Sequence, residues 1–282
     1  HRICFVTMIN LDDDAGEVAP PRRRRFGGAA LRMSLTITPI PGLPRIRPGD
    51  DIAPLVVAAC DAAGSVLAAG DIVVVCQKIV SKSEGRIVPL AGITPSPLAR
   101  RIAAQGDGKD PRAVEVVLGE TQRIVRMSGG RLIVETGPGW VCANAGVDES
   151  NCDDAETVIL LPEDPDSSAD RLRTRLRGLT GAAVAVIISD TWGRPFREGL
   201  TDVALGVSGM NALRDLRGES DLNGRTLHHT VLAQADALAA AAGLVMGKGD
   251  GVPVVLVRGY PHESTMGSGR DLIRDRASDL FR

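Results

Sequence analysis

The sequence has few aromatic residues, no long apolar run and almost no net charge. Only 2% of its 282 residues are aromatic although 44% are hydrophobic, so a core of this size must consist mainly of Val, Leu, Ile and Ala. Its 33 basic and 35 acidic residues give a net charge of -2, which indicates neither a nucleic-acid partner nor an anionic membrane. The longest apolar stretch, around Ala237–Met246, is much shorter than the roughly 20 residues of a membrane span. We therefore expect a soluble globular protein without a transmembrane segment, which binds small polar ligands.

The cysteines are few and widely spaced. They form no CxxC pair and have no histidine at metal-ligand spacing, which argues against a zinc site and against a disulfide framework. A reducing, cytoplasmic environment fits this pattern. The five are Cys4, Cys60, Cys76, Cys142 and Cys152.

The N-terminal 33 residues differ in composition from the rest. They contain Asp12–Asp14 and Arg22–Arg25, and they lack the apolar segment of a secretory signal. We predict that residues 1–33 form a disordered extension and that residues 34–282 form one folded domain, with a basic arm that is translocated or binds nucleic acid as the alternative.

The folded part alternates β-branched runs with polar or Gly/Pro turns in an irregular order. No GxGxxG motif follows the first strand, so a mixed α+β fold is favoured over a doubly wound Rossmann sheet. Two helices are expected: Ala169–Leu179, capped by Ser167 or Ser168, and Thr230–Ala242, stopped by Gly243. The expected strands are Ser34–Ile40, Asp71–Cys76, Arg131–Glu135, Val158–Leu161, Val184–Ser189 and Pro253–Arg258.

One segment, Asp71–Gly85, passes from a buried strand into a polar stretch that we interpret as a turn. Lys82 can neutralise a phosphate as a point charge, and Ser81 and backbone N–H groups can bond to phosphate oxygens. The alternative is that the lysines are simply solvated surface residues.

Carboxylates occur in two further turn-prone segments. Asp148 follows Gly146, where it could equally form an ordinary Asx-turn. Asp190 and Thr191 follow an apolar strand and would present a carboxylate and a hydroxyl side by side. Together these oxygen donors suit Mg²⁺ or Mn²⁺, which also bind phosphates.

The remaining candidates are weaker. Arg194 and Arg197 could present guanidinium groups to a phosphate or a carboxylate, or be an ordinary surface pair. The glycine-rich segment Met246–Val252 permits close approach of the backbone to a ligand, although connectors need glycine too. We interpret the adjacent His228 and His229 as structural.

Taken in order, these motifs resemble coenzyme F420-0:L-glutamate ligases, the γ-glutamyl ligases that extend the side chain of coenzyme F420. The resemblance runs from about Ile37 to Gly259 and rests on several ordered segments. These are Gly42–Asp51, Gln77–Arg86, Asn144–Asn151, Leu160–Asp166, Ser189–Arg197 and Met246–Pro253.

The resemblance implies a GTP-dependent acid–amino-acid ligase with a mixed-sheet fold and an intertwined homodimer. Its small-molecule substrates would be F420-0, L-glutamate and GTP, with Mg²⁺ or Mn²⁺ required and K⁺ as an activating ion. Asp148 and Asp190 would ligate one metal and Thr191 a second, and Lys82 would assist phosphoryl transfer. The implied GTP contacts are Leu43, Pro44, Arg45, Ile46, Gln77, Lys78, Lys82, Asn151, Met246, Gly247, Lys248, Gly249, Asp250, Gly251 and Val252.

Two features depart from family patterns. Archaeal members carry a metal-ligating glutamate where this chain has Lys248, so either Asp250 supplies the carboxylate or Lys248 itself faces the phosphate. Some bacterial relatives continue into a flavin-binding domain that this sequence lacks, so FMN is not expected here.

Two alternative functions remain open from the sequence. The first is a metal- and nucleotide-dependent ligase or phosphotransferase that acts on another acidic metabolite. The second is a GTP-binding module without turnover. We hypothesise that Arg194 and Arg197 hold the acidic acceptor or the incoming glutamate.

Overall fold

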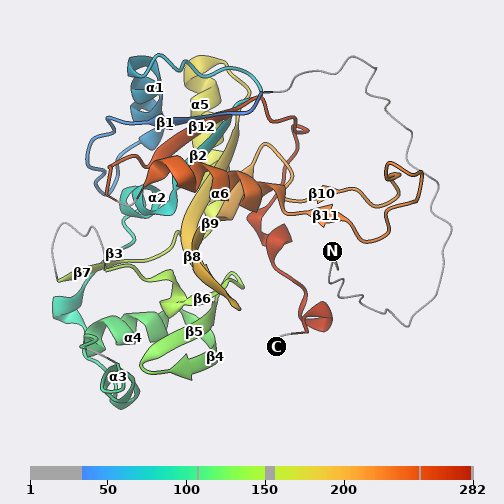
Figure 1. The fold of residues 1–282 in the computed structure, drawn as a ribbon. Coiled ribbons are helices and arrows are strands. Elements are labelled where there is room, and N and C mark those ends of the chain that lie inside the picture. The colour runs from blue at the N-terminus through green and yellow to red at the C-terminus, as the bar shows by residue number, and fades with distance from the viewer. Residues whose placement is uncertain (1–33, 107, 150–155, 248, 281–282) are drawn as a thin grey trace.

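The structure is a computed structural model that describes residues 34–106, 108–149, 156–247 and 249–280 (Figure 1). The predicted N-terminal extension, 1–33, therefore lies outside the described residues, and the prediction of a single folded domain over 34–282 stays a prediction. Asn151 and Lys248 also lie outside them. No helix in the described ranges is long and apolar enough to cross a membrane. Within the same ranges Cys60, Cys76 and Cys142 are free thiols.

A five-stranded mixed sheet forms the centre of the larger part, which we call the main lobe. Its strand order is β1-β12-β2-β8-β9, and β2 pairs with β8 in parallel while the other neighbours are antiparallel. The mixed sheet of the sequence prediction is thus confirmed. The strands are β1 (Thr36–Ile40), β2 (Ile72–Cys76), β8 (Ala185–Arg194), β9 (Arg197–Ser208) and β12 (Val254–Arg258).

Helices cover both faces of this sheet. Along β2, Val73 and Val75 pack against α1 (Ile52–Ala62) and α5 (Pro165–Thr180), whereas Ile72 and Val74 pack against α6 (Gln234–Met246). All four side chains are fully buried, because successive residues of a strand point to opposite faces. The sheet is therefore the middle of three layers, which explains why β2 and the first half of β8 are almost continuously apolar.

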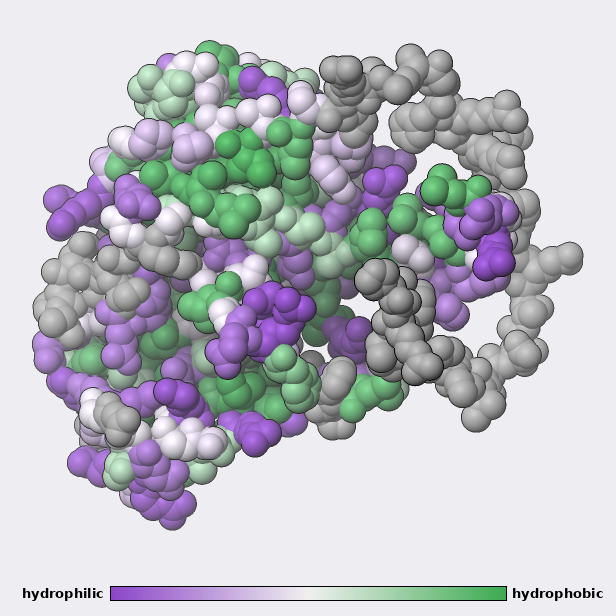
Figure 2. Space-filling model, viewed as in Figure 1, coloured by the Kyte–Doolittle hydropathy of each residue, from purple (hydrophilic) through white to green (hydrophobic). Residues whose placement is uncertain are grey.

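A small lobe is formed by chain between β2 and α5 and lies below the main sheet (Figure 1). Figure 2 shows hydrophobic residues gathered over the main lobe and hydrophilic ones at the outer edge of the small lobe. The small lobe comprises β3 (Ile87–Pro89), η1 (Leu90–Gly92), α3 (Pro97–Ala103), α4 (Pro111–Gly119), β4 (Thr121–Ser128), β5 (Arg131–Thr136), β6 (Val141–Ala143), η2 (Asn144–Gly146) and β7 (Thr157–Ile159).

The remaining elements are short. Between the lobes lies α2 (Gln77–Ser83), and a two-stranded ribbon of β10 (Arg214–Asp215) and β11 (Val231–Leu232) extends from the main lobe. His228 and His229 lie in an exposed bend of this ribbon, so the structural role expected for them has no support in core packing. The 3₁₀ turns η3 (Gly269–Leu272) and η4 (Arg276–Ser278) follow β12.

Both predicted helices exist, but their bounds were wrong. The first begins at Pro165, and its N-cap is Asp164, whose Oδ1 accepts from the Ser167 amide at 3.2 Å. Proline has no backbone N–H, and at the first helical position such a group would have no partner within the helix. The helix therefore starts earlier than the apolar pattern suggested. The second runs from Gln234 to Met246 and passes through Gly243, which is therefore not its stop.

Two local predictions at the ends of β2 and β8 were also wrong. Gln77–Ser83 is a helix rather than a turn. The strand expected to end at Ser189 continues to Arg194, because its polar second half pairs with β9 in a long hairpin whose last pair is Arg194 with Arg197. The apolar pattern predicted that the strand ends at its first polar residue, Ser189. Backbone pairing with β9 does not depend on side-chain polarity, so the strand continues.

The packing of α5 on β9 gives a test of the fold. A Cβ on Gly206 of β9 would lie 2.1 Å from the carbonyl oxygen of Pro165, so either the helix or the strand would have to move. We expect Gly206→Ala to lower the free energy of unfolding by about 1–3 kcal/mol, measured by urea denaturation.

The matched control is Gly178→Ala in α5, where no atom lies within 4 Å of the added Cβ. Because alanine is the better helix former, this variant should be up to about 1 kcal/mol more stable. Equal effects of the two substitutions would contradict the close approach of α5 to β9.

Candidate active site

The candidate site lies where several strand ends meet at one edge of the main sheet. Cys76 at the end of β2 is opposite Ser189 of β8, so α2 and Asp190 start from adjacent positions. Ile40 at the end of β1 is opposite Val254 at the start of β12. Three predicted segments, 43–46, 77–82 and 246–252, are thereby connected to the same edge as Asp190, as expected for ligand sites at strand ends.

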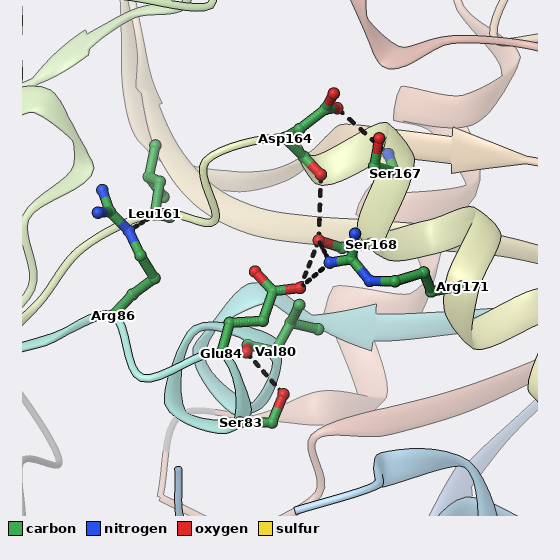
Figure 3. Close-up of polar contacts among 9 residues, drawn as sticks. All are labelled: Val80, Ser83, Glu84, Arg86, Leu161, Asp164, Ser167, Ser168 and Arg171. Carbon is green, nitrogen blue, oxygen red and sulfur yellow. Dashed lines mark hydrogen bonds and ion pairs between the residues drawn. The ribbon is translucent and has the colours of Figure 1, made fainter. Parts of the chain in front are cut away.

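The helix α2 carries three of the predicted residues. Gln77 is 1% exposed, and its Oε1 accepts from Ser81 Oγ at 2.8 Å, which fixes the first turn of the helix. Lys78 and Lys82 are partly exposed and remain accessible from solvent. Figure 3 shows how the other end of α2 is held: Glu84 accepts from Ser168 Oγ and from Arg171 Nη2 of α5, each at 2.5 Å.

Asp148 reaches the site from a strained turn of the small lobe. Asn144, Ala145 and Gly146 have φ values of 50°, 54° and 68°, a left-handed run that non-glycine residues rarely adopt. After this turn Asp148 forms a β-bridge with Ile159. Its Oδ2 lies 2.7 Å from Lys78 Nζ, so the structure brings these two predicted residues into direct contact.

Asp190 lies within β8 beside other carboxylates. Burial, and to a smaller extent the charges of Asp148 and Asp202, raise the pKa of its carboxyl group to about 6, against hydrogen bonds from the Thr191 backbone and from Trp192. Trp192 Nε1 donates to Asp190 Oδ2 at 3.2 Å. The carboxylates therefore repel one another at neutral pH, and a cation between them would relieve this repulsion.

One residue of this group, Asp202, was missed by the sequence analysis. It lies on β9 directly opposite Thr191, whose hydroxyl donates to Asp202 Oδ1 in a short hydrogen bond. Asp202 is 8% exposed. Its sequence context, a single acid before a run of small and apolar residues, gave no signal that separates it from an ordinary strand residue.

The predicted nucleotide segments differ in exposure. Ile46 is buried and Leu43 packs against the core, whereas Pro44 and Arg45 are exposed. The loop that they begin is tied to α2, because the Gly49 amide donates to the Ser83 carbonyl at 2.8 Å.

On the other side of the sheet edge, the loop after α6 is shaped by two glycines. Gly247 and Gly251 have φ values of 61° and 67°, so both positions favour glycine. Met246 is buried against the core, and Asp250 lies close to Gly247. The backbone of this loop joins β2 through the Cys76 amide, which donates to the Pro253 carbonyl at 2.8 Å.

Arg194 and Arg197 are not part of the carboxylate group. Both are exposed at the tip of the β8–β9 hairpin, and Arg194 Nη2 donates to the Glu198 carbonyl at 3.0 Å. Asp190 and Arg194 are four positions apart along the strand, so their Cα atoms are separated by roughly 13 Å. Any ligand that contacts both must therefore be extended.

The donor set suits a hard cation rather than a thiophilic one. Within the described ranges no three His, Cys, Asp or Glu side chains are grouped so as to hold a metal ion. The predicted ligands Asp148, Asp190 and Thr191 supply oxygen atoms, which Mg²⁺ and Mn²⁺ prefer and supplement with water or phosphate. The mutual repulsion near Asp190 provides a second reason that a cation fits here.

Comparison with known proteins identifies the class of this chain as a ligase. Residues 42–259 match the family described as F420-0:Gamma-glutamyl ligase. The chain therefore belongs to the F420-0:gamma-glutamyl ligase family, and the resemblance noted from the sequence is confirmed.

Curated relatives cover most of the chain. It is 49% identical over 253 residues to the coenzyme F420:L-glutamate ligase of Methanothermobacter thermautotrophicus, covering 89% of this chain and 100% of that protein. The ligase of Methanopyrus kandleri is 48% identical over 88% of this chain and 98% of its own length. The ligase of Archaeoglobus fulgidus is 42% identical over 89% and 97%, respectively.

The raised pKa of Asp190 predicts a pH-dependent stability of the metal-free protein. Because the folded-state pKa of about 6 lies above the ordinary value of 3.8, the folded protein binds this proton more tightly, and stability falls as pH rises between these values. Asp190→Asn cannot ionise. In EDTA it should therefore be more stable than the wild type at pH 7 by about 3 kcal/mol, and by much less near pH 4.

Urea denaturation of both proteins from pH 4 to pH 7 measures this difference. The exposed Asp61 on α1 provides the control, because Asp61→Asn should not change the pH dependence. A constant difference between Asp190→Asn and the wild type across the pH range would contradict the raised pKa of Asp190.

Proposed function

We propose that this chain is a coenzyme F420:L-glutamate ligase that uses GTP to add L-glutamate to F420-0. The observation that carries the proposal is its identity of 42–49% with proteins of that name over nearly their whole length. The meeting of Lys78, Asp148, Asp190 and Thr191 at one sheet edge supports it. Oxygen donors beside lysines are suited to nucleotide phosphates.

The reaction needs an activated acceptor. A carboxylate does not react with an amine at a useful rate, because its oxyanion is a poor leaving group. The terminal carboxylate of F420-0 attacks the γ-phosphorus of GTP, the bond to the β-phosphate oxygen breaks, and GDP leaves. The glutamate α-amine, having lost a proton, then attacks the acyl carbon, and inorganic phosphate departs with formation of the amide bond. A second round through the γ-carboxylate of the added glutamate gives the γ-linked product.

The proposed roles follow from position. Asp148 and Asp190 hold a first Mg²⁺ or Mn²⁺ and Thr191 contacts a second; the cations offset charge on the transferring phosphoryl group. Lys78 leaves Asp148 for a phosphate when the site is loaded, and Lys82 lies one turn further along α2 for the γ-phosphate. Both lysines act as point charges that place the phosphates for in-line transfer.

The remaining parts of the proposal concern the surroundings of this centre. The segment 43–46, Gln77 and the loop 246–252 contact the nucleotide, together with Asn151 and Lys248, which lie outside the described residues. We further propose that K⁺ activates the enzyme, that the chain works as a homodimer, and that it acts in the cytoplasm. Size-exclusion chromatography with light scattering tests the dimer directly.

The first experiment on this proposal is mass spectrometry of the reaction product. F420-0 incubated with the protein, L-glutamate, GTP and Mg²⁺ or Mn²⁺ should gain one or more glutamyl units. Asp190→Ala should reduce the rate at least 100-fold, because it removes a proposed metal ligand.

Asp61→Ala is the matched control, since it removes an exposed carboxylate far from the sheet edge and should leave the rate unchanged. Absence of a glutamyl product from a folded protein that binds GTP would overturn the proposed substrate. Full activity of Asp190→Ala would overturn the proposed metal site.

The arginines at the hairpin tip provide a separate prediction. If they hold the acidic acceptor or the incoming glutamate, Arg194→Ala/Arg197→Ala should raise the KM for that substrate about tenfold or more, as expected for lost charge-assisted hydrogen bonds. The KM for GTP should not change.

Arg100→Ala/Arg101→Ala on α3 is the control, because it removes the same charge from exposed positions in the small lobe. Steady-state kinetics with each substrate varied in turn distinguishes the two pairs. Unchanged acceptor and glutamate KM values in the Arg194/Arg197 variant would remove these arginines from the site.

A further inference from the structure

Asp202 is a buried carboxylate at the contact between β8, β9 and α6. It is 8% exposed, and it lies on β9 directly across from Thr191 of β8. Burial of a charged group is costly unless partners compensate for the lost hydration. Asp190, which precedes Thr191 on β8, is another carboxylate near it. The two carboxylates therefore place negative charge on both sides of the Thr191 position.

The hydrogen bond between Thr191 and Asp202 has a defined direction. Thr191 Oγ1 donates to Asp202 Oδ1, and a carboxylate at neutral pH can only accept. A hydroxyl has one proton and two lone pairs, so the oxygen that donates to Asp202 can also contact a cation. The bond also increases the negative charge on that oxygen, which makes it a better ligand for a cation.

The opposite side of Asp202 faces α6 at Gly243. A Cβ at Gly243 would lie 2.3 Å from Asp202 Oδ2 and 2.8 Å from its Cγ, closer than real contacts allow. Glycine within a helix is unfavourable relative to alanine. Its presence at this turn of α6 therefore leaves space for the Asp202 carboxylate, which is enclosed between Thr191 on one side and the helix on the other.

We propose that Asp202 is a positioning residue that orients and polarises the Thr191 hydroxyl for a divalent cation. The inference rests on the proposed function only in taking Thr191 as a cation contact. Asp202 acts through Thr191 rather than by ligating the cation itself. Carboxylates that hydrogen-bond to a metal ligand in this way typically contribute 10–100-fold to metal affinity.

The test measures Mn²⁺ binding by the full chain, with free Mn²⁺ quantified by electron paramagnetic resonance and no nucleotide present. Asp202→Asn keeps an acceptor oxygen but loses the charge, and Thr191→Val removes the hydroxyl at similar volume. Each variant should bind Mn²⁺ 10–100-fold more weakly than the wild type. The double variant should be no weaker than Thr191→Val alone, because the two residues act as one unit.

The matched control is Asp236→Asn. Asp236 is another carboxylate at the contact of α6 with β9, where its Oδ1 accepts from the Ala204 amide at 2.9 Å. Because this bond holds backbone of β9 rather than the Thr191 hydroxyl, the substitution should leave Mn²⁺ affinity unchanged. A loss in Asp236→Asn equal to that in Asp202→Asn would reduce the role of Asp202 to packing and overturn the proposal.

The remaining outcomes are equally decisive. Wild-type affinity in Asp202→Asn, or the absence of Mn²⁺ binding by the wild type, would overturn the proposal. Additive losses in the double variant would also overturn it, because Asp202 would then act independently of Thr191. The proposal is supported if Asp202→Asn binds Mn²⁺ more weakly than the wild type and the double variant binds it no more weakly than Thr191→Val. This holds even if the wild type forms no glutamyl product from F420-0. Failure of the proposed function is thereby distinguished from failure of this inference.

Discussion

The parallel pairing of β2 with β8 is the interaction on which the arrangement of the candidate site depends. It aligns Cys76 with Ser189, so α2, which follows β2, and the polar half of β8 begin at the same level. Antiparallel β12 then brings the loop after α6 to the same edge through the Cys76–Pro253 hydrogen bond. Ligand sites at the carboxyl ends of strands in open sheets follow from the same geometry.

The charged side chains at this edge of the sheet are better suited to binding a ligand than to stabilising the fold. Burial and the charges of Asp148 and Asp202 raise the pKa of Asp190, and Lys78 Nζ forms an ion pair with Asp148. Perturbed carboxyl groups of this kind concentrate at functional sites, and a cation bound here would offset the negative charge of the group. The hydrogen bonds of Glu84 to α5 hold α2 rigidly, so the lysines are presented from a fixed backbone (Figure 3).

Several parts of the fold and site could be predicted from the sequence. The apolar strands were found because a short continuous run of β-branched residues, as in Ile72–Cys76, is typical of a strand buried on both faces. Asp148, Asp190 and Lys78 were predicted as site residues from motifs whose order along the chain resembles one family, and the structure brings Lys78 and Asp148 into contact. Element ends were less accurate. Pro165 begins a helix through the local cap at Asp164, which the prediction overlooked, and Gly243 lies inside a helix, where it packs against Asp202.

The sequence by itself determined the family, the apolar strands and the residue types that suit phosphate and cation chemistry, because these depend on local pattern and ordered motifs. Only the tertiary structure decided that Lys78 contacts Asp148, that Asp202 lies across from Thr191, and that Arg194 stands at the tip of a hairpin. Each of these depends on the register between segments distant in sequence. The apolar pattern of β9 shows which of its side chains face the core, but it does not say which residue of β8 lies opposite each of them.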